Sequence, residues 1–354
     1  MGPAMTELPG DMSARLTARK LAGYASIGFA CTVVAAMGCS LVGMVRIDIT
    51  AGQSWQVWNW PLWQHPVWQL RLGRLATAAV SGAALSAAGM ALQGLLRNDL
   101  AEPYILGISS GAGVGVILGQ ALVGAIGLAA WATTPVLALA GALATCAVVY
   151  GIAQRRGRLD PYVLLLSGVV ISVFNSAIIM GVMLFVNRNE LLAYVGWGMG
   201  RISDHTSPPL LLACSLCVLA GWGVLLLRGA AFNMLGLGDD VAASSGVAVH
   251  YLRVETFAVV GLMTAAAVAL AGPIGFLGLI VPHIARMIVG ADHRKLVLVS
   301  GFAGAVVLML ADTLARTAGA WINVGDIPVG VITAVAGGPF FIYLLRRRFR
   351  GQTA

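Results

Sequence analysis

The sequence predicts an all-α polytopic membrane protein with about ten transmembrane helices. Of its 354 residues, 59% are hydrophobic and only 10% are charged, whereas a soluble domain carries about 25% charged residues. Long apolar runs recur from Leu21 to Leu345, and a run of about 20 apolar residues crosses a bilayer as a helix. The alternating pattern of a membrane β-barrel is missing. These observations predict a helical membrane domain.

The apolar runs set the expected helices in chain order. The ten expected spanning segments are residues 21–45, 71–96, 107–127, 134–153, 161–186, 208–228, 253–271, 275–290, 296–316 and 328–345. The first is too long for the core of a signal peptide and is typical of a spanning helix. The eighth is short and follows the seventh almost directly. Two outer loops, residues 190–202 and 321–328, are expected to form short surface helices.

We expect residues 21–346 to form a single transmembrane domain, with cytoplasmic tails at 1–20 and 347–354. With the N-terminus inside, most lysines and arginines fall on the cytoplasmic side of the membrane. Most tryptophans fall on the outer side, where aromatic rings favour the membrane interface. The net charge of +8 is therefore explained by topology, and no nucleic acid partner is needed to account for it.

The stretch from Gly229 to Arg253 stands out because it holds the only adjacent pair of acids in the sequence, Asp239 and Asp240. We expect a helix of about six residues here, with Asp239 as its N-cap and Gly246 ending it. A helix this short does not persist alone in water. The sequence therefore predicts that a partner holds it.

The sequence lacks the usual sources of energy and catalysis. Neither lysine follows a glycine-rich phosphate-binding loop, so the chain is not expected to bind ATP itself. The carboxylates lie at helix ends or in loops, which disfavours the first alternative, an ion-coupled secondary transporter. The second alternative, a membrane enzyme, lacks a catalytic constellation, and we predict no catalytic residue and no metal ligand.

Two pairs of polar residues have competing interpretations. His283 and Arg286 lie in the eighth segment, where local hydrogen bonds near a helix end are favoured over a proton relay. Cys214 and Cys217 form a CxxC motif inside an apolar run. Because no further cysteine or histidine is near them, we interpret both as packing residues and not as a redox or metal pair.

Three groups of motifs carry a resemblance. They are residues 71–74 (RLGR), 82–85 (GAAL), 98–103 (NDLAEP) and 107–112 (GISSGA); residues 272–286 (GPIGFLGLIVPHIAR) and 292–294 (DHR); and residues 311–316 (ADTLAR), 327–330 (IPVG) and 338–341 (GPFF). Together they resemble the signatures of the FecCD family, the permeases of ABC importers for iron-siderophores, haem and cobalamin. The likeness spans nearly the whole chain after Leu21.

The resemblance implies a fold like that of the cobalamin importer permease, with ten helices and an inverted repeat. It also implies a bacterial inner-membrane location with both termini in the cytoplasm. The implied partners are a second copy of the chain or a related permease, two ATP-binding subunits inside, a substrate-binding protein outside and the lipid bilayer. No cofactor is implied for this chain, since ATP and magnesium belong to the ATPase. The chelate itself is left open, with siderophore first as the broadest class.

The resemblance also assigns roles to particular residues. The loop at 229–253 corresponds to the coupling helix, and the residues expected to contact the ATPase are Leu235, Leu237, Asp239, Asp240 and Val241. The arginines expected to dock the binding protein at the outer mouth are Arg71, Arg74 and Arg316. Guanidinium groups suit this role because they hold carboxylates bidentately; the alternative is interfacial snorkelling. The family usually has proline at the position of Gly73.

The remaining assignments concern the pathway. Asn98 and Leu100 match positions near the cytoplasmic gate, where the family often has proline at the position of Asp99. The fifth expected helix carries a modest polar face, and its expected pathway residues are Ser167, Ser172 and Asn175. Such a face would pass a bulky polar chelate without gripping it. The alternative is that the same side chains bond one helix to another.

Overall fold

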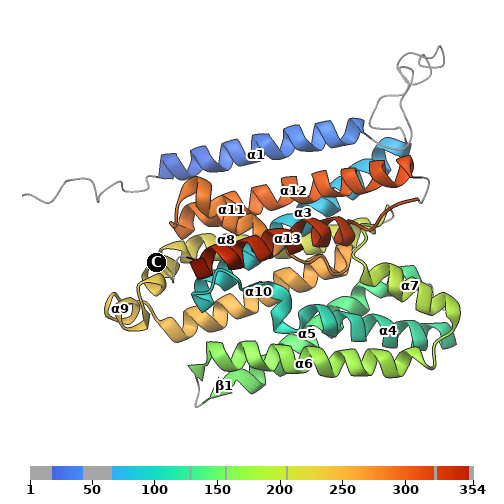
Figure 1. The fold of residues 1–354 in the computed structure, drawn as a ribbon, viewed down its shortest axis with the longest axis horizontal. Coiled ribbons are helices and arrows are strands. Elements are labelled where there is room, and N and C mark those ends of the chain that lie inside the picture. Colours follow the sequence, from blue (N-terminus) through green and yellow to red (C-terminus); the bar gives the residue numbers. More distant parts are fainter. Residues whose placement is uncertain are drawn as a thin grey trace, which may run out of the picture.

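The computed structural model describes residues 18–42, 66–126, 130–155, 158–204, 206–322 and 325–350. These residues form an all-helical bundle (Figure 1). Its longer helices are α1 (Ala18–Leu41), α3 (Pro66–Leu96), α4 (Ile108–Ile126), α5 (Ala130–Ala153), α6 (Pro161–Met183), α8 (Pro208–Gly236), α10 (Val249–Ala271), α11 (Leu277–Val289), α12 (His293–Trp321) and α13 (Val329–Arg350). Shorter pieces are the 3₁₀ turn η2 (Pro103–Leu106), α7 (Arg188–Gly198) and α9 (Asp239–Ser244). A hairpin of β1 (Gln154–Arg155) and β2 (Arg158–Leu159) joins α5 to α6.

Each of the ten expected spanning segments is found as a helix. Within the described residues, eight helices are long and apolar enough to cross a membrane, and two shorter apolar helices, Ile108–Ala121 and Leu277–Val289, accompany them. The short eighth segment is α11, with 13 residues. An α-helix rises about 1.5 Å per residue, so α11 is too short to cross the hydrocarbon core alone.

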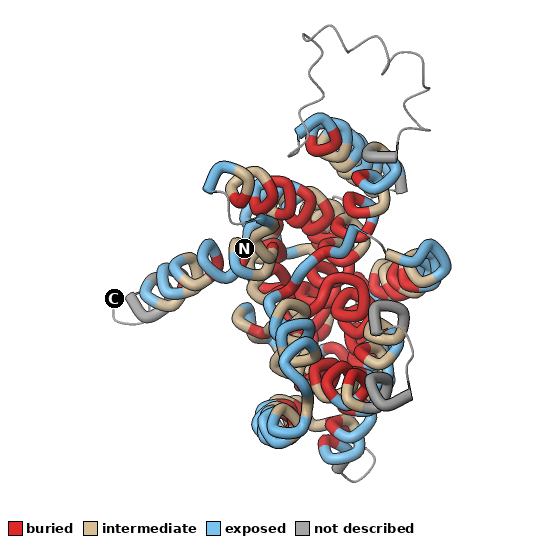
Figure 2. The backbone as a smooth tube through the Cα atoms, turned by 90° about the vertical axis from the view of Figure 1, so that its right-hand side faces the viewer, coloured by how far each residue is buried: buried red, intermediate tan, exposed pale blue. Residues whose placement is uncertain are grey.

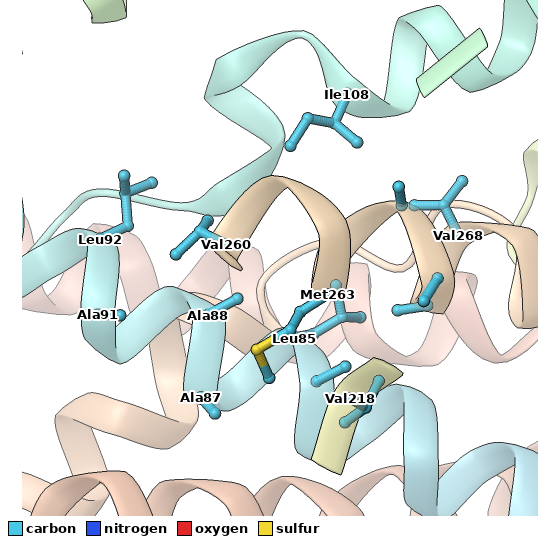
Figure 3. Packing of buried hydrophobic residues seen from close by; sticks show 14 of the residues in the cluster. Leu85, Ala87, Ala88, Ala91, Leu92, Ile108, Val218, Val260, Met263 and Val268 are labelled. Atoms are coloured by element: carbon cyan, nitrogen blue, oxygen red, sulfur yellow. The ribbon is translucent and has the colours of Figure 1, made fainter. Parts of the chain in front are cut away.

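The middle of the bundle is built from α3, α10 and α12. These three helices are the most buried of the eight helices that could span a membrane, and Figure 2 shows a buried centre with more exposed helices around it. In Figure 3, Leu85, Ala88 and Leu92 of α3 lie close to Val260 and Met263 of α10. Because alanines recur along this face, the two helices approach closely over their length.

Glycine allows the closest of these approaches. A methyl group at Gly82 of α3 would overlap the carbonyl oxygen of Gly304 on α12, and one at Gly89 would overlap that of Gly278 on α11. Helices without a bulky residue at the crossing gain dispersion contact between backbones, which is the main force available inside a lipid bilayer. These glycines allow close packing, and they make α3 the common neighbour of α11 and α12.

One expected surface helix is found, and two other boundaries differ from the sequence expectation. The surface helix expected at 190–202 is confirmed as α7, which begins with a capping box between Asn187 and Glu190. The second, at 321–328, is wrong over the described residues, since α12 continues to Trp321 and residues 325–328 are not helical. Also, α8 runs eight residues past the expected end at 228, to Gly236, because the buried Phe232 and Leu235 extend its packed face.

Candidate functional site

The short helix α9 lies at one end of the bundle, next to the junction of α8 and α10 (Figure 1). It has six residues, as expected. Its N-cap is Gly238 and not Asp239, and Gly238 has a φ of 124° that other residues rarely adopt. Its C-terminal end is a Schellman motif: Gly246, at φ 84°, donates to the carbonyl of Ala243 at 3.0 Å, and Val247 donates to that of Ala242 at 3.0 Å. The predicted role of Gly246 is confirmed.

Contacts within the chain already hold this helix. The Asp239 carboxylate accepts from Arg97 at the end of α3, at 2.6 Å, and from Arg253 on α10, at 2.7 Å. Ala242 is fully buried beneath the helix. The expectation that a helix this short needs an outside partner is therefore corrected, because Asp239 ties α9 to two helices of its own chain. Asp239 forms this bridge and is not the N-cap of α9, contrary to the prediction.

The side chains predicted to contact an ATPase divide into two groups. Leu237 is 67% exposed and Val241 is 44% exposed, and Asp240 is exposed beside them. Leu235, in contrast, is fully buried in the core at the end of α8, so its predicted surface role is wrong and it anchors the helix instead. The exposed leucine and valine form a small apolar surface with an acid at its side.

The loop between α3 and η2 lies near α9 and carries the two predicted gate residues. The Asn98 side chain accepts from the backbone N–H of Leu100 at 3.1 Å, which makes a tight turn. Asp99 pairs with Arg286 of α11. The charge at position 99 thus joins this loop to α11, and the interpretation of Arg286 as a local hydrogen-bonding residue near a helix end is confirmed.

Glu102 closes this loop against α11. One oxygen of its carboxylate accepts from the backbone N–H of Phe276, at 2.5 Å, and Phe276 is the N-cap of α11 at a left-handed φ of 68°. Burial raises the pKa of Glu102 above its usual value, although the Phe276 hydrogen bond opposes this rise. The carboxyl group therefore holds the first turn of α11 in place in either protonation state.

Replacing Glu102 by alanine is expected to destabilise the chain by about 1–3 kcal/mol, because the Phe276 N–H loses its acceptor while buried. Glu102→Gln is the matched control, since the amide oxygen still accepts from Phe276. Thermal unfolding of the detergent-purified protein measures both. Since the pKa of Glu102 is raised on folding, the stability of the wild type should fall as the pH rises from the unfolded-state pKa towards the folded one, and Glu102→Gln should lose this dependence. Equal stability of the alanine variant and the wild type would exclude this role.

The predicted pathway residues of α6 face the interior of the bundle. Ser167 and Asn175 are 5% and 7% exposed. The Asn175 amide donates to Ser110 at 3.0 Å and to Thr145 at 3.2 Å, which joins α6 to α4 and α5, while Ser172 bonds back to the carbonyl of Gly168. The helix-to-helix alternative is therefore found for Asn175, and the role of these three side chains in a pathway stays a prediction.

The exposed face of α6 is apolar. Val170 is 57% exposed, Val173 is 67%, and Leu184, just after the helix, is 81%. Helix α13 also exposes Val335 and Ile342, at 70% and 54%, and Figure 2 shows α13 leaving the body of the bundle. These faces are apolar without any polar stripe, so they suit contact with lipid or with another apolar helix.

The arginines predicted at the outer mouth lie at the end of the bundle opposite α9. Arg74 makes the centre of an ionic cluster: its guanidinium donates to Asp312 of α12 at 2.9 Å, to Asp204 at 2.7 Å and to Asp326 at 3.1 Å. The side chains of Arg74 and Asp312 are 3% and 1% exposed. One arginine thus joins α3 to α12 and to the loops before α8 and α13.

The other two arginines are buried as well. Arg71 is 6% exposed and donates to the carbonyl of Ser40 on α1 at 2.8 Å. Arg316 is 8% exposed and pairs with Asp312 at 3.2 Å. The expectation that the three guanidinium groups are presented at the surface is therefore wrong in this conformation, because they are engaged within the chain. Docking of a binding protein by these residues stays a prediction.

Sequence reasoning missed the acids of this cluster. Asp312 lies in the ADTLAR motif, but its partner Arg74 is 238 positions away, and nothing in a single sequence pairs them. Arg97, Arg253 and Asp99 were missed for the same reason. Within the described part of the chain, no group of three histidines, cysteines or acids is placed to hold a metal ion. Cys214 and Cys217 are free thiols on α8, as the packing interpretation requires.

The sequence of this chain matches known proteins along most of its length. A model of the FecCD transport family matches residues 31–347. An uncharacterised ABC transporter permease of Bacillus subtilis is 38% identical over 259 residues, covering 73% of this chain and 72% of the relative. The cobalamin import system permease of Halobacterium salinarum is 39% identical, covering 72% and 66%. The hemin transport system permease of Yersinia pestis is 36% identical, covering 72% and 75%.

A solved structure gives the same result for the fold. It is described as an inward-facing conformation of a metal-chelate type ABC transporter, and it is 27% identical to this chain. The match covers 92% of this chain and 99% of the solved one, with a TM-score of 0.77. The arrangement of the helices is therefore the one seen in that transporter.

Proposed function

The chain belongs to the FecCD transport family, and we propose that it is the transmembrane permease subunit of an ABC importer that moves an iron chelate, haem or cobalamin into the cytoplasm. The observation that carries this proposal is the exposed surface of α9, formed by Leu237, Val241 and Asp240. Because this sequence contains no phosphate-binding loop, a separate subunit would have to bind the ATP that drives such an importer. An apolar surface beside an acid, held rigidly at one end of the bundle, suits such a contact.

The orientation follows from this assignment. If α9 meets the ATPase, its end of the bundle lies in the cytoplasm, and α1 begins and α13 ends at that same end (Figure 1). Most positive residues outside the membrane also fall there, as the positive-inside rule requires. We therefore place both ends of the described chain on the cytoplasmic side of the membrane.

The apolar outer face of α6 supports a second copy of the chain as partner. Val170, Val173 and Phe174 expose between 57% and 67% of their surface, and a symmetric dimer would cover them with the same face of the partner. The substrate pathway would then lie between two largely apolar walls. Such walls hold a large polar chelate weakly, which leaves selection of the substrate to the binding protein.

The proposed function predicts how the surface of α9 responds to charge. Replacing Leu237 or Val241 by aspartate should weaken binding of the ATPase subunit by about tenfold for each residue, because truncation of an interface anchor costs more than about 1 kcal/mol. Co-purification and surface-immobilised binding of the separate ATPase measure this. Both side chains are exposed, so the variants should fold and insert normally. Ser245→Asp, exposed at the other end of α9, is the control.

Unchanged ATPase binding would contradict the proposed docking role of α9. If both aspartate variants bind the ATPase as tightly as the wild type and Ser245→Asp does, then α9 is not the docking surface. The role of Leu237 and Val241 would then be withdrawn.

A further inference from the structure

A cavity of about 570 Å³ lies behind α7, at the end of the bundle opposite α9. It is a partly open cavity lined by the outer ends of α4, α5 and α10 together with α7 and the loop that follows it, and these elements meet at the same end in Figure 1. Its walls mix apolar side chains, such as Leu192 and Leu270, with the polar groups of Gln120, Arg201 and Asp204. The function proposed above makes no use of this cavity.

Gln120 is the first sign of a ligand. Its side chain, on α4, is 6% exposed, and its Oε1 atom accepts no hydrogen bond from the described residues. A buried amide oxygen without a donor is unfavourable, and in native proteins such a group is normally paired with protein, water or a ligand. The wall of this cavity therefore offers a buried acceptor that lacks its donor.

Arg201 and Asp204 add one charge of each sign to the same cavity. Arg201 is 52% exposed and lies 3.6 Å from Asp326, and among the described residues no hydrogen bond occupies its five N–H donors. Asp204 is 47% exposed and uses one oxygen to bind Arg74. The cavity thus presents a donor group suited to a phosphate and two acceptors suited to an ammonium group.

The position of the cavity selects the source of such a ligand. The outer ends of three spanning segments, α4, α5 and α10, lie where lipid headgroups meet the protein, and the apolar wall continues onto Leu192, which is 60% exposed on α7. A ligand that combines a phosphate, an ammonium group and acyl chains would fill all three kinds of wall. Phosphatidylethanolamine has this composition.

We propose that this cavity binds the headgroup of phosphatidylethanolamine from the outer leaflet. Arg201 binds the phosphate, and Asp204 together with the Oε1 atom of Gln120 accepts hydrogen bonds from the ammonium group. The acyl chains leave over Leu192. A choline headgroup would carry the same charges but has no N–H to donate to Gln120, so the buried amide distinguishes the two lipids.

Native mass spectrometry of the full-length protein, purified in detergent with equal amounts of phosphatidylethanolamine and phosphatidylcholine, tests this assignment. We expect about tenfold more bound phosphatidylethanolamine, because a hydrogen bond to a charged group changes affinity by about that factor or more. Stepwise N-methylation of the headgroup should reduce binding stepwise. This series uses only the wild-type protein and does not depend on any variant folding.

Single substitutions then test which side chain binds which part of the lipid headgroup. Gln120→Leu should bring phosphatidylethanolamine binding closer to that of phosphatidylcholine, with the remaining preference due to Asp204, whereas Arg201→Gln should lower binding of both lipids together. Gln154→Leu is the control, because Gln154 is exposed at the opposite end of the bundle. Equal binding of the two lipids by the wild type would overturn the proposal. Equally tight binding of soluble phosphoethanolamine would overturn the lipid assignment, because the acyl chains would then contribute nothing.

Discussion

Replacing Arg74 by alanine is expected to destabilise the folded chain by about 3 kcal/mol, the low end of the range for breaking a buried ion pair, because the buried Asp312 carboxylate then keeps only Arg316 as a charged partner among the described contacts. The two side chains are 3% and 1% exposed, and Asp312 accepts from Arg74 in a bidentate arrangement at 2.9–3.1 Å. Asp204, which is 47% exposed, adds little, since water screens a half-exposed pair. The loss should appear in thermal unfolding of the purified protein.

A triple variant separates the ion cluster from the packing. Arg74→Met, Asp312→Leu and Arg316→Met together remove the three buried charges and keep apolar volume, and this variant should recover much of the lost stability. Arg188→Ala, at the exposed start of α7, is the arginine control and should change stability by less than about 0.5 kcal/mol. If Arg74→Ala matched Arg188→Ala, the cluster would not be what holds the outer ends of α3 and α12 together.

The same result would bear on the docking prediction. Arg71, Arg74 and Arg316 are buried in this conformation, so an acidic surface of a binding protein would have to compete with Asp312 for Arg74 and Arg316 and with the Ser40 carbonyl for Arg71. Competition of this kind would release the loops held by Asp204 and Asp326. Docking by these arginines would therefore open the outer end of the chain as it occurs, which is a role that exposed arginines would not have.

The sequence was sufficient to predict the ten spanning segments, because each depends on a local run of apolar residues. Gly246 was also predictable, since a Schellman end needs only its own neighbours. The direction in which a side chain points was not. Asn175 lies on a polar face of α6 that a pathway or a neighbouring helix would serve equally well, and only the positions of Ser110 and Thr145 decide between them.

The ion-pair partners of helix α3 also could not be predicted from the sequence. Its residues read as an apolar span with an arginine near each end, and the partners of those arginines are distant in the sequence. In the fold, Arg74 at its outer end joins the loops there, and Arg97 at its inner end joins α9. Between them, glycine contacts fix α3 against α11 and α12. Because these contacts fix α3 at both ends and along its length, we expect a movement of α9 to reach the outer end through this helix.

Replacing Asp239 by alanine should uncouple ATP hydrolysis from transport, on the premise that α9 docks the ATPase. The exposed Leu237 and Val241 remain for binding, but α9 loses its ties to α3 and α10. We expect transport in proteoliposomes to fall by roughly 5- to 150-fold, the range of a coupling free energy of about 1–3 kcal/mol, while the ATPase still binds. Asp240→Ala is the comparison variant. Asp240 belongs to the proposed docking surface but makes no such bridge among the described contacts, so its loss should weaken ATPase binding and leave the coupling of the bound complex intact.

Arg97→Gly separates this uncoupling from a loss of stability. Arg97 has a φ of 50°, a left-handed conformation that costs a side-chain residue about 1–2 kcal/mol and glycine very little. Its ion pair with Asp239 is about 40% exposed on both sides, so losing it costs at most about 1 kcal/mol. The glycine variant should therefore be as stable as the wild type and still transport slowly. Normal transport by Arg97→Gly and Asp239→Ala would show that the force from α9 reaches the bundle by another route.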